Sequence, residues 1–288
     1  MADFKIDRRN PWRNAWALLK SYRTYVSAGP FADLNRMLLF TGYPRSGHTL
    51  LAALLDAHPQ ILLAHQAYAL EYFQRGIAKE RVFQILHDNA TRFTAAGRQW
   101  MGYDYQIPGQ WQGRYQDLRL IGDKSGGITA RKIFQQGDFK SLEAVTRQGV
   151  QPIFLHVLRN PYDIVTTMAK RSMARQNKSV TARDLDRKIE HFMKHAVGVS
   201  RLKQHGVHII YDVYSEDVIR DTRGVMTRLL ERLDLLAEPD YLRACDELVW
   251  DQPRTSRHSL PFWTPERVER FAERLRPFPW FARYTFTE

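Results

Sequence analysis

The sequence has little cysteine and no long apolar run. Cys245 is the only cysteine among 288 residues, which excludes an intramolecular disulfide framework and fits a reducing compartment. No run approaches the ~20 apolar residues that a membrane-spanning helix needs. The N-terminus also lacks an apolar run of signal-peptide length. Five basic residues interrupt it: Arg8, Arg9, Arg13, Lys20 and Arg23. These absences predict a soluble, cytoplasmic protein without stable membrane insertion.

Acidic residues are also fewer than basic ones. The chain has 31 of them against 43 lysines and arginines, which gives a formal net charge of +12. Clustered basic residues would indicate nucleic-acid binding, but here they are spread along the whole chain. No zinc-finger spacing, RNP-like aromatic strand or low-complexity basic arm accompanies them. An anionic cofactor or acceptor explains the charge equally well, and we expect no nucleic-acid partner.

Segments that would divide the chain are missing too, since it has no internal repeat and no linker rich in Gly, Ser or Pro. The length suits one large core, so we expect a single domain over residues 36–288. Residues 1–35 would form a basic, aromatic helical extension. Its stretch 12–25 has the pattern of an amphipathic surface helix, which would pack on the domain or on the second subunit of a homodimer rather than on a membrane.

Five short apolar runs are present, each followed by a helix-length segment. Such runs are typical of buried strands in a parallel sheet. We therefore predict an α/β fold whose central, mostly parallel sheet is flanked by helices. Helical patterns are also predicted at 220–244 and from Thr264, ahead of Pro265, and residues 102–116 read as a loop. The five runs lie at residues 36–42, 60–64, 118–123, 152–158 and 207–212.

The first run leads into TGYPRSGHTLL, residues 41–51. This stretch matches the phosphate-loop pattern G-x-x-x-x-G-K-[ST] at Gly42, Gly47 and Thr49, but His48 stands where the lysine should be. A strand, a glycine-containing turn and a helix N-terminus form an anion site, because backbone amides are unpaired there and the helix dipole adds positive charge. The pattern therefore predicts a loop for a phosphate ester, without deciding which one.

The fourth run ends in a cation. An NTPase would be expected to carry an acidic residue at the end of such a strand to hold Mg²⁺, but LHVLRNPYDIVTTM places Arg159 there. A guanidinium can fork onto a phosphate near the helix that begins at Pro161, and Thr167 would lie about two turns along that helix. Taken alone, Pro161 and Asp163 also read as an ordinary helix start. Asp123 follows another strand and keeps an NTPase function open.

The order and spacing of the two motifs carry a resemblance. YPRSGHTLL, followed about 110 residues later by VLRNPYDIVTTM, resembles the sulfotransferases that use 3'-phosphoadenosine 5'-phosphosulfate (PAPS), and their bacterial members most closely. The resemblance extends to LLDAHPQILLAHQ, LIGDKSGG, IIYDVYSEDV and SRHSLPFWTPERV, and so to most of residues 36–288. It implies a three-layer, P-loop-like fold, use of PAPS without a metal, and release of adenosine 3',5'-bisphosphate.

The resemblance also implies which residues bind the cofactor. Arg159 and Thr167 would bind the 3'-phosphate, with Thr167 in place of the family's serine. The C-terminal Ser256 and Arg257 resemble a loop that closes over the same end. The phosphosulfate would be bound by the first motif, at Arg45, Ser46, Gly47, His48, Thr49 and Leu50. His48 departs from the more usual threonine, and it either donates to the same oxygens or serves packing.

The catalytic residues are less sharply indicated. Arg45 is the candidate that stabilises charge growing on the bridging oxygen. Gln66 stands where the bacterial pattern would place a glutamate base, so His65 is our first candidate for the general base. Asp123 is an alternative base or would orient Lys124, and Lys124 would assist the transferring group. His48 remains a further alternative.

The acceptor is only loosely indicated. Aromatic residues are dense between 66 and 117, and they either line a pocket for a ring-bearing small molecule or glycan or belong to the core. Two other functions stay open from the sequence. One is a kinase or NTPase with an altered phosphate loop, and the other is a noncatalytic nucleotide-binding or nucleic-acid-binding protein.

Overall fold

The computed structural model describes residues 31–137 and 139–287. The predicted N-terminal helix at 12–25 lies outside the described residues. The boundary between an extension and the domain at residue 36 therefore stays a prediction.

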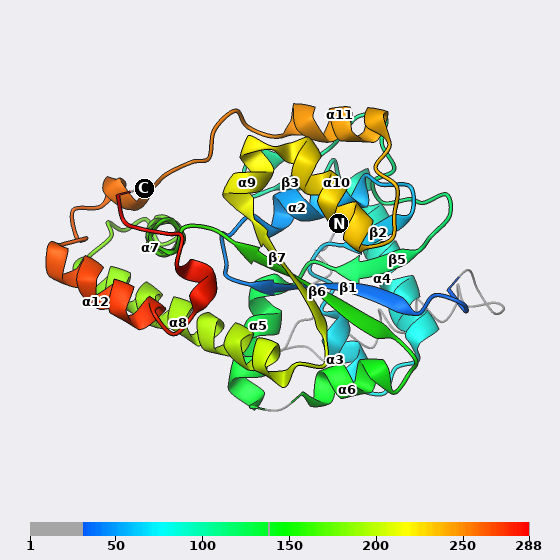
Figure 1. The fold of residues 1–288 in the computed structure, drawn as a ribbon, viewed down its shortest axis with the longest axis horizontal. Helices are drawn as coiled ribbons and strands as arrows, with labels where there is room; N and C mark the ends of the chain where they lie inside the picture. The colour runs from blue at the N-terminus through cyan, green and yellow to red at the C-terminus, as the bar shows by residue number, and fades with distance from the viewer. Residues whose placement is uncertain (1–30, 138, 288) are drawn as a thin grey trace.

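A parallel sheet forms the centre of the described chain (Figure 1), with the strand order β2-β5-β1-β6-β7. The five predicted apolar runs are all confirmed as its strands, with ends shifted by at most two residues. Their bounds are β1 (Arg36–Gly42), β2 (Ile61–Ala64), β5 (Leu120–Asp123), β6 (Gln151–Leu158) and β7 (Ile209–Tyr214). Every pairing among them is parallel, which confirms the predicted α/β architecture.

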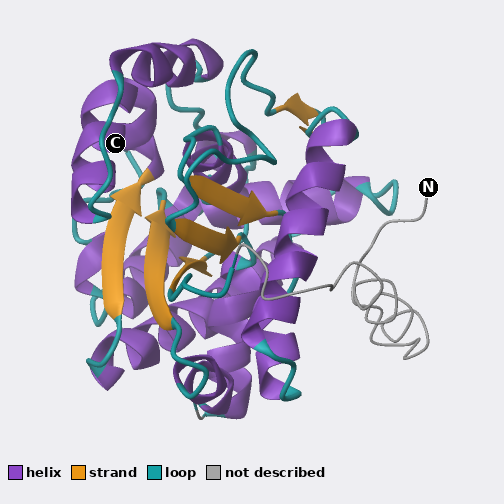
Figure 2. Ribbon diagram, turned by 90° about the vertical axis from the view of Figure 1, so that its right-hand side faces the viewer, coloured by secondary structure: helices purple, strands orange, loops and turns teal. Residues whose placement is uncertain are grey.

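Alternation along β1 explains the layers. Leu38 and Phe40 pack into a cluster on one face of the sheet, while Met37 and Leu39 pack into a cluster on the other, because successive side chains of a strand point to opposite faces. Both faces are thus covered by helices, as Figure 2 shows. A continuous apolar run, rather than an alternating one, is what two covered faces require.

Three groups of helices make up these layers. The first face is covered by α2 (His48–Asp56), α9 (Ser215–Arg220), α10 (Thr222–Arg232) and α11 (Pro239–Leu248). The second is covered by α3 (Ala69–Gln74), α4 (Lys79–Ala95) and α6 (Lys140–Thr146). A third apolar cluster joins α5 (Gly126–Gln136), α7 (Pro161–Ala174), α8 (Ala182–His205), α12 (Pro265–Leu275) and the short helix η2 (Pro279–Phe281).

Two local predictions need correction. The helical pattern at 220–244 is interrupted between α10 and α11, where Asp234 has a φ of 58° and Pro239 starts the next helix. The loop at 102–116 contains part of a small hairpin, β3 (Gln99–Trp100) with β4 (Tyr103–Asp104). Strands of two residues are too short to produce a periodic pattern, and the turn residues Met101 and Gly102, both at positive φ, are the signal that was missed.

The strand order decides where a ligand can bind. From β1 the chain continues to β2 and β5 on one side of the sheet, and to β6 and β7 on the other. Ligands of open parallel sheets bind outside the carboxyl ends of the strands, at the point where the order reverses. Here that point is the end of β1, with the ends of β5 and β6 beside it.

Candidate functional site

A cavity of about 890 Å³ opens at this point, near the upper end of the ~300–1,000 Å³ that small-molecule sites occupy. Its wall combines the loop after β1, the end of β5, the start of α5, one side of α7 and the segment 250–256. Positive charge dominates this wall, which carries eight lysines and arginines: Arg45, Lys124, Arg131, Arg159, Lys170, Arg171, Arg175 and Arg254. Among the described residues that line the cavity, Glu216 is the only acidic side chain.

The loop between β1 and α2 is tightly built. Gly47 has a φ of 100°, and a Cβ added there would lie 2.9 Å from Cβ of Ser215, so the turn requires glycine. The buried hydroxyl of Ser46 donates to the carbonyl of Tyr43 at 2.8 Å. Leu51 donates to the carbonyl of Gly47 at 3.1 Å, and the amides of residues 47–50, including Leu50, therefore precede the first intrahelical bond and are available to an anion.

Arg45 stands at the tip of this loop with a φ of 75°. A left-handed conformation is costly for a residue other than glycine, by about 1–3 kcal/mol, and such strain concentrates at ligand-binding sites. Burial, followed by repulsion from Arg171 and Arg175, lowers the pKa of Arg45 to about 10. The side chain is therefore still a cation at neutral pH, although two other cations, Arg171 and Arg175, lie close to it.

His48 is directed back into the protein. Its Nε2 lies 3.1 Å from the carbonyl oxygen of Thr41, and its ring packs so closely on Gly126 that a Cβ there would be 2.4 Å from Nε2. Burial lowers the pKa of His48 to about 3, so the imidazole is neutral. Of the two sequence-based interpretations, this geometry favours packing, with the His48 amide still at the helix start.

Lys124 and His65 form a pair at the ends of β5 and β2. The Nζ of Lys124 lies 3.5 Å from Nε2 of His65 and donates to the hydroxyl of Thr49 at 3.3 Å. The imidazole of His65 stacks on Phe93, with ring centroids 4.1 Å apart, and meets the edge of Trp100. Lys124 reaches the cavity wall, whereas His65 lies behind it.

Burial controls the charge of Lys124. The side chain is 4 % exposed, and burial lowers the pKa of its amine to about 7, although neighbouring Asp123 opposes the shift. The amine is therefore poised between its charged and neutral forms near neutral pH, which is a property of functional lysines. Sequence analysis placed Lys124 at the site, but could not predict its protonation.

Asp123 is fully occupied by the loop that carries His65. Its two carboxylate oxygens accept hydrogen bonds from the amides of Ala67 and Ala69, each at 2.9 Å, and from the hydroxyl of Ser125 at 2.9 Å. Burial raises the pKa of Asp123, while these donors oppose the rise. The carboxylate holds a loop in which Gln66 and Tyr68 have positive φ, and a carboxylate used in this way is poorly placed to act as a base or to bind Mg²⁺.

The two sequence motifs meet at Arg159. Its Nη1 donates to the backbone carbonyl of Arg45 at 3.1 Å, and its Nη2 donates to the carbonyl of Arg254 at 2.6 Å. Residues 114 positions apart thus lie side by side. Pro161 begins α7 immediately afterwards, and the side chain of Asn160 caps this helix by accepting from the amide of Tyr162.

Thr167 and Ser256 also meet, with their hydroxyl oxygens 3.0 Å apart, and both line the cavity. Arg257 is placed differently. It is 4 % exposed and pairs with Asp163 at 2.6 Å, whose other oxygen accepts the amides of Ser256 and Arg257. This buried ion pair fastens the segment 250–259 to the first turn of α7, so the guanidinium of Arg257 is turned away from the cavity that Ser256 lines.

Sequence analysis missed the cations that follow Thr167 on α7. Thr167, Arg171 and Arg175 recur every fourth residue, which puts them on one face of the helix, and all three line the cavity. Arg171 donates to the carbonyl of Met101 at 3.3 Å. The four-residue spacing was readable in the sequence, but a helical face of arginines is ordinarily exposed to solvent. Only the structure shows that the hairpin β3–β4 packs against this face and encloses it.

The aromatic stretch divides between cavity and core. Tyr68, Trp100, Tyr103 and Tyr105 line the cavity, joined by Trp250 from the C-terminal segment. Other members are buried in the second apolar cluster: Tyr72, Phe73 and Phe83. Both sequence-based interpretations of this stretch therefore apply, each to part of it.

Three further features concern the wider chain. Cys245 is buried, and burial raises the pKa of its thiol to about 12, which fits packing rather than catalysis. Within the described ranges, no cluster of three or more His, Cys, Asp or Glu could hold a metal ion. None of the helices described here is both long and apolar enough to cross a membrane.

Comparisons with known proteins bear on the family and the fold. The profile of the Sulfotransferase family matches residues 38–239. The fold is similar to that of the sulfotransferase STF9 from Mycobacterium avium, at 14% identity and a TM-score of 0.51, over 91% of this chain and 83% of that one. Mouse sulfotransferase SULT7A1, solved with PAP, is similar at 14% identity and a TM-score of 0.47, over 92% of each chain. A comparison with curated protein sequences found no match.

Proposed function

Because this chain belongs to the sulfotransferase family, we propose that it transfers a sulfuryl group from PAPS to a hydroxyl or amine of a small-molecule or glycan acceptor. One observation carries the choice of donor. Arg45 and Arg159, from motifs on two different strands, converge on one cavity, where Arg159 donates to the carbonyl of Arg45. An adenosine carrying an anion at each end of its ribose needs two such cationic positions.

The residues fit this donor in two groups. The amides of residues 47–50 and the guanidinium of Arg45 would bind the phosphosulfate, since both offer donors at a helix N-terminus. Arg159 would bind the 3'-phosphate with its planar fork, assisted by the hydroxyls of Thr167 and Ser256. These hydroxyls bond each other, the fork contacts two backbone carbonyls, and all three side chains line the same cavity, which supports a shared phosphate site.

The reaction requires charge stabilisation and a proton acceptor. The acceptor oxygen or nitrogen forms a bond to sulfur, the bond from sulfur to the bridging oxygen breaks, and its electron pair stays on the departing phosphate. Arg45 and protonated Lys124 would stabilise the charge that grows on that oxygen. Because His65 lies behind Lys124, with its Nε2 3.5 Å from the Lys124 amine, the acceptor's proton would reach it through that amine. Lys124 would pass one proton to Nε2 as it receives the acceptor's proton, so that the two side chains act as one acid–base pair.

The pKa of Lys124 leads to a pH-dependent prediction. In the free protein this pKa is about 7, and a bound anion favours the ammonium form and so raises it. Binding of adenosine 3',5'-bisphosphate should therefore take up a proton above pH 7, and its affinity should fall by up to about tenfold per pH unit between about pH 7 and 9. Calorimetry in buffers of different ionisation enthalpy measures both effects.

Lys124→Met should remove the proton uptake and flatten the pH profile. Lys178→Met, an exposed lysine in the loop between α7 and α8, is the matched control and should leave the profile unchanged. A slope that persists in Lys124→Met would show that another group takes up the proton.

The test of the donor compares it with the NTPase alternative. We expect adenosine 3',5'-bisphosphate to bind at least about tenfold more tightly than ATP with Mg²⁺, because Asp123 is committed to backbone amides and Arg159 replaces an acidic strand end. Calorimetric titration of the full chain with each nucleotide measures this preference. Tighter binding of MgATP would contradict the proposal, as would steeply salt-dependent binding of nucleic acid without nucleotide preference.

A further inference from the structure

The cations of the cavity stand apart from those elsewhere in the chain. Among the described residues, no carboxylate forms an ion pair with any of the eight lysines and arginines that line the wall. Arginines outside the cavity are regularly paired, as in Arg267–Asp186, Arg274–Glu190 and Arg283–Asp217. Glu216 forms no ion pair with them in the described chain; it accepts from the amide of Asn160 and the hydroxyl of Tyr284, and its single charge offsets only a small part of the total.

The proposed donor accounts for only part of this charge. The 3'-phosphate of the donor is a monoester, which carries a charge of about −1.5 to −2 at neutral pH. The phosphosulfate adds roughly two more negative charges, because its phosphate and its sulfate group are both strong acids and each is ionised once. About four negative charges from the donor, with the carboxylate of Glu216, thus face seven cations and Lys124, whose pKa of about 7 leaves it partly charged. Uncompensated positive charge in a half-enclosed site is costly, and an anionic ligand relieves it.

The surplus is concentrated at Arg171 and Arg175. Arg171 lies on α7 one turn beyond Thr167, Arg175 caps the end of that helix one turn farther on, and both contact Met101 at the turn of the hairpin. Arg171 also reaches toward the hydroxyl of Tyr103, with its guanidinium carbon 5.7 Å from the ring centroid. Of the charged side chains near Arg45, these two repel it most strongly. They therefore lie near Arg45, the side chain that we propose binds the phosphosulfate.

We propose that the acceptor is itself an anion, and that Arg171 and Arg175 bind its carboxylate, phosphate or sulfate group while its hydroxyl or amine lies near Lys124. This inference rests on the proposed function and adds the substrate class. The aromatic side chains of Tyr103 and Tyr105 supply a surface for the body of the molecule, since both line the cavity beside Arg45. Arg171 is half-buried and Arg175 exposed, so the anionic group would lie at the mouth of the cavity.

A charge series on one scaffold tests this inference. The full chain, saturated with adenosine 3',5'-bisphosphate, is titrated with 4-hydroxyphenylphosphonate, 4-hydroxybenzoate and 4-hydroxybenzamide. We expect affinity to fall in that order, with at least about a tenfold difference between the phosphonate and the amide, because hydrogen bonds to charged groups are the stronger ones. The difference should shrink as salt is raised, since the site is open to solvent.

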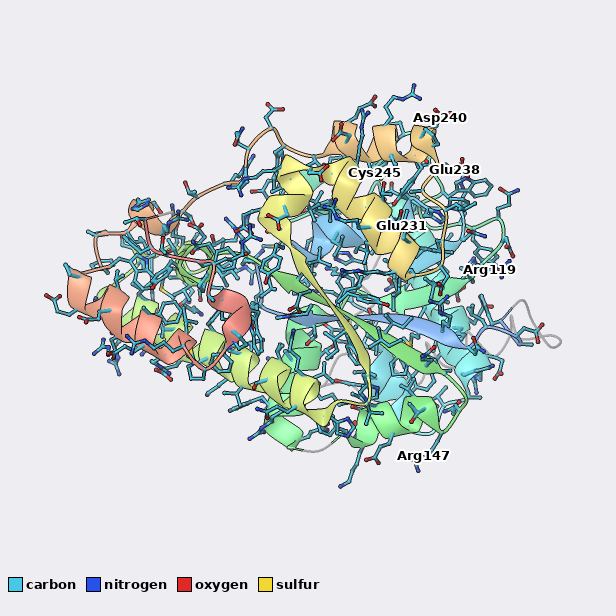
Figure 3. The ribbon with its side chains drawn as sticks, in the orientation of Figure 1. Arg119, Arg147, Glu231, Glu238, Asp240 and Cys245 are labelled. Carbon is cyan, nitrogen blue, oxygen red and sulfur yellow. The ribbon has the colours of Figure 1, made fainter. Side chains whose placement is uncertain are left out.

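The variants locate the anion. Arg171→Gln/Arg175→Gln should bring the three affinities within about twofold of one another, while the Kd for adenosine 3',5'-bisphosphate changes by less than about threefold. Arg147→Gln is the matched control, because Arg147 is exposed at the end of α6 (Figure 3), far from α7 as labelled in the same orientation in Figure 1, and should preserve the series. Melting curves confirm that each variant is folded.

The outcomes separate this inference from the proposed function. Equal affinities for the three compounds, or no binding of either anion, would overturn the anionic acceptor alone. A charge preference that survives in Arg171→Gln/Arg175→Gln would also overturn it, because the anion would then sit elsewhere, for example beside Arg45. If the wild-type chain fails to bind adenosine 3',5'-bisphosphate, the proposed function fails and this inference fails with it.

Discussion

Replacing Arg159 with alanine is expected to weaken binding of adenosine 3',5'-bisphosphate about 100-fold. A guanidinium that forks onto a phosphate makes two charge-assisted hydrogen bonds, and losing both costs roughly 3 kcal/mol. The same change removes the two bonds by which Arg159 holds the carbonyls of Arg45 and Arg254, so the loop after β1 loses a support. Calorimetric titration of the purified variant measures the affinity.

Two companion variants distinguish the binding of the 3'-phosphate by Arg159 from its support of the loop after β1. Arg159→Lys keeps the charge but loses the fork, and it should recover about tenfold of the lost affinity. Arg147→Ala removes an exposed arginine at the far end of the sheet and should leave the Kd unchanged. If Arg159→Ala binds the nucleotide as tightly as wild type while its melting temperature is preserved, Arg159 is not a ligand of the 3'-phosphate.

Replacing His65 with alanine is expected to lower kcat by about 10³-fold, because a general base contributes ~10²–10⁴-fold. The Kd for adenosine 3',5'-bisphosphate should change by less than about threefold, since His65 lies behind Lys124 rather than on the cavity wall. Transfer of radiolabelled sulfate from PAPS to 4-hydroxyphenylphosphonate would measure turnover. This split between rate and binding distinguishes a base from a residue that merely supports the loop.

A control variant at a residue that packs on His65 tests whether the imidazole itself is required. Phe93→Leu removes the ring that stacks on His65 but keeps the imidazole, so it should cost much less than His65→Ala. Full turnover in His65→Ala would show that another group takes the proton, and Lys124 would then be the next residue to examine.

How far the sequence predicts this protein can be seen in single residues. The strand at 36–42 and the helix starts at Pro161 and near Thr264 were all readable, because apolar runs and prolines act within a few residues of themselves. The convergence of Arg45 and Arg159 was predictable for a related reason. Each follows a buried strand, and parallel strands bring their carboxyl ends to the same edge of a sheet.

The roles of Asp123 and Arg257 could not be read in the same way. Each looks available in the sequence, yet Asp123 accepts amides 54 and 56 residues away, and Arg257 pairs with a carboxylate 94 residues away. Because these side chains are bound to partners within the protein, they are not available to a ligand, although the sequence pattern suggested that they were. Arg171 and Arg175 show the converse, since a hairpin about 70 residues earlier encloses a face that would otherwise be solvated.

The sequence by itself determined the α/β layers, the glycine-containing loop after β1 and the two arginines that meet at the sheet edge, because these depend on local patterning and on the direction of strands. Only the tertiary structure decided which polar groups remain available for chemistry. A group that packing places beside a hydrogen-bond or ion-pair partner within the protein is no longer available to a ligand. Burial likewise set the pKa of Lys124 near 7, since desolvation depends on every segment that covers a side chain and not on its neighbours in sequence.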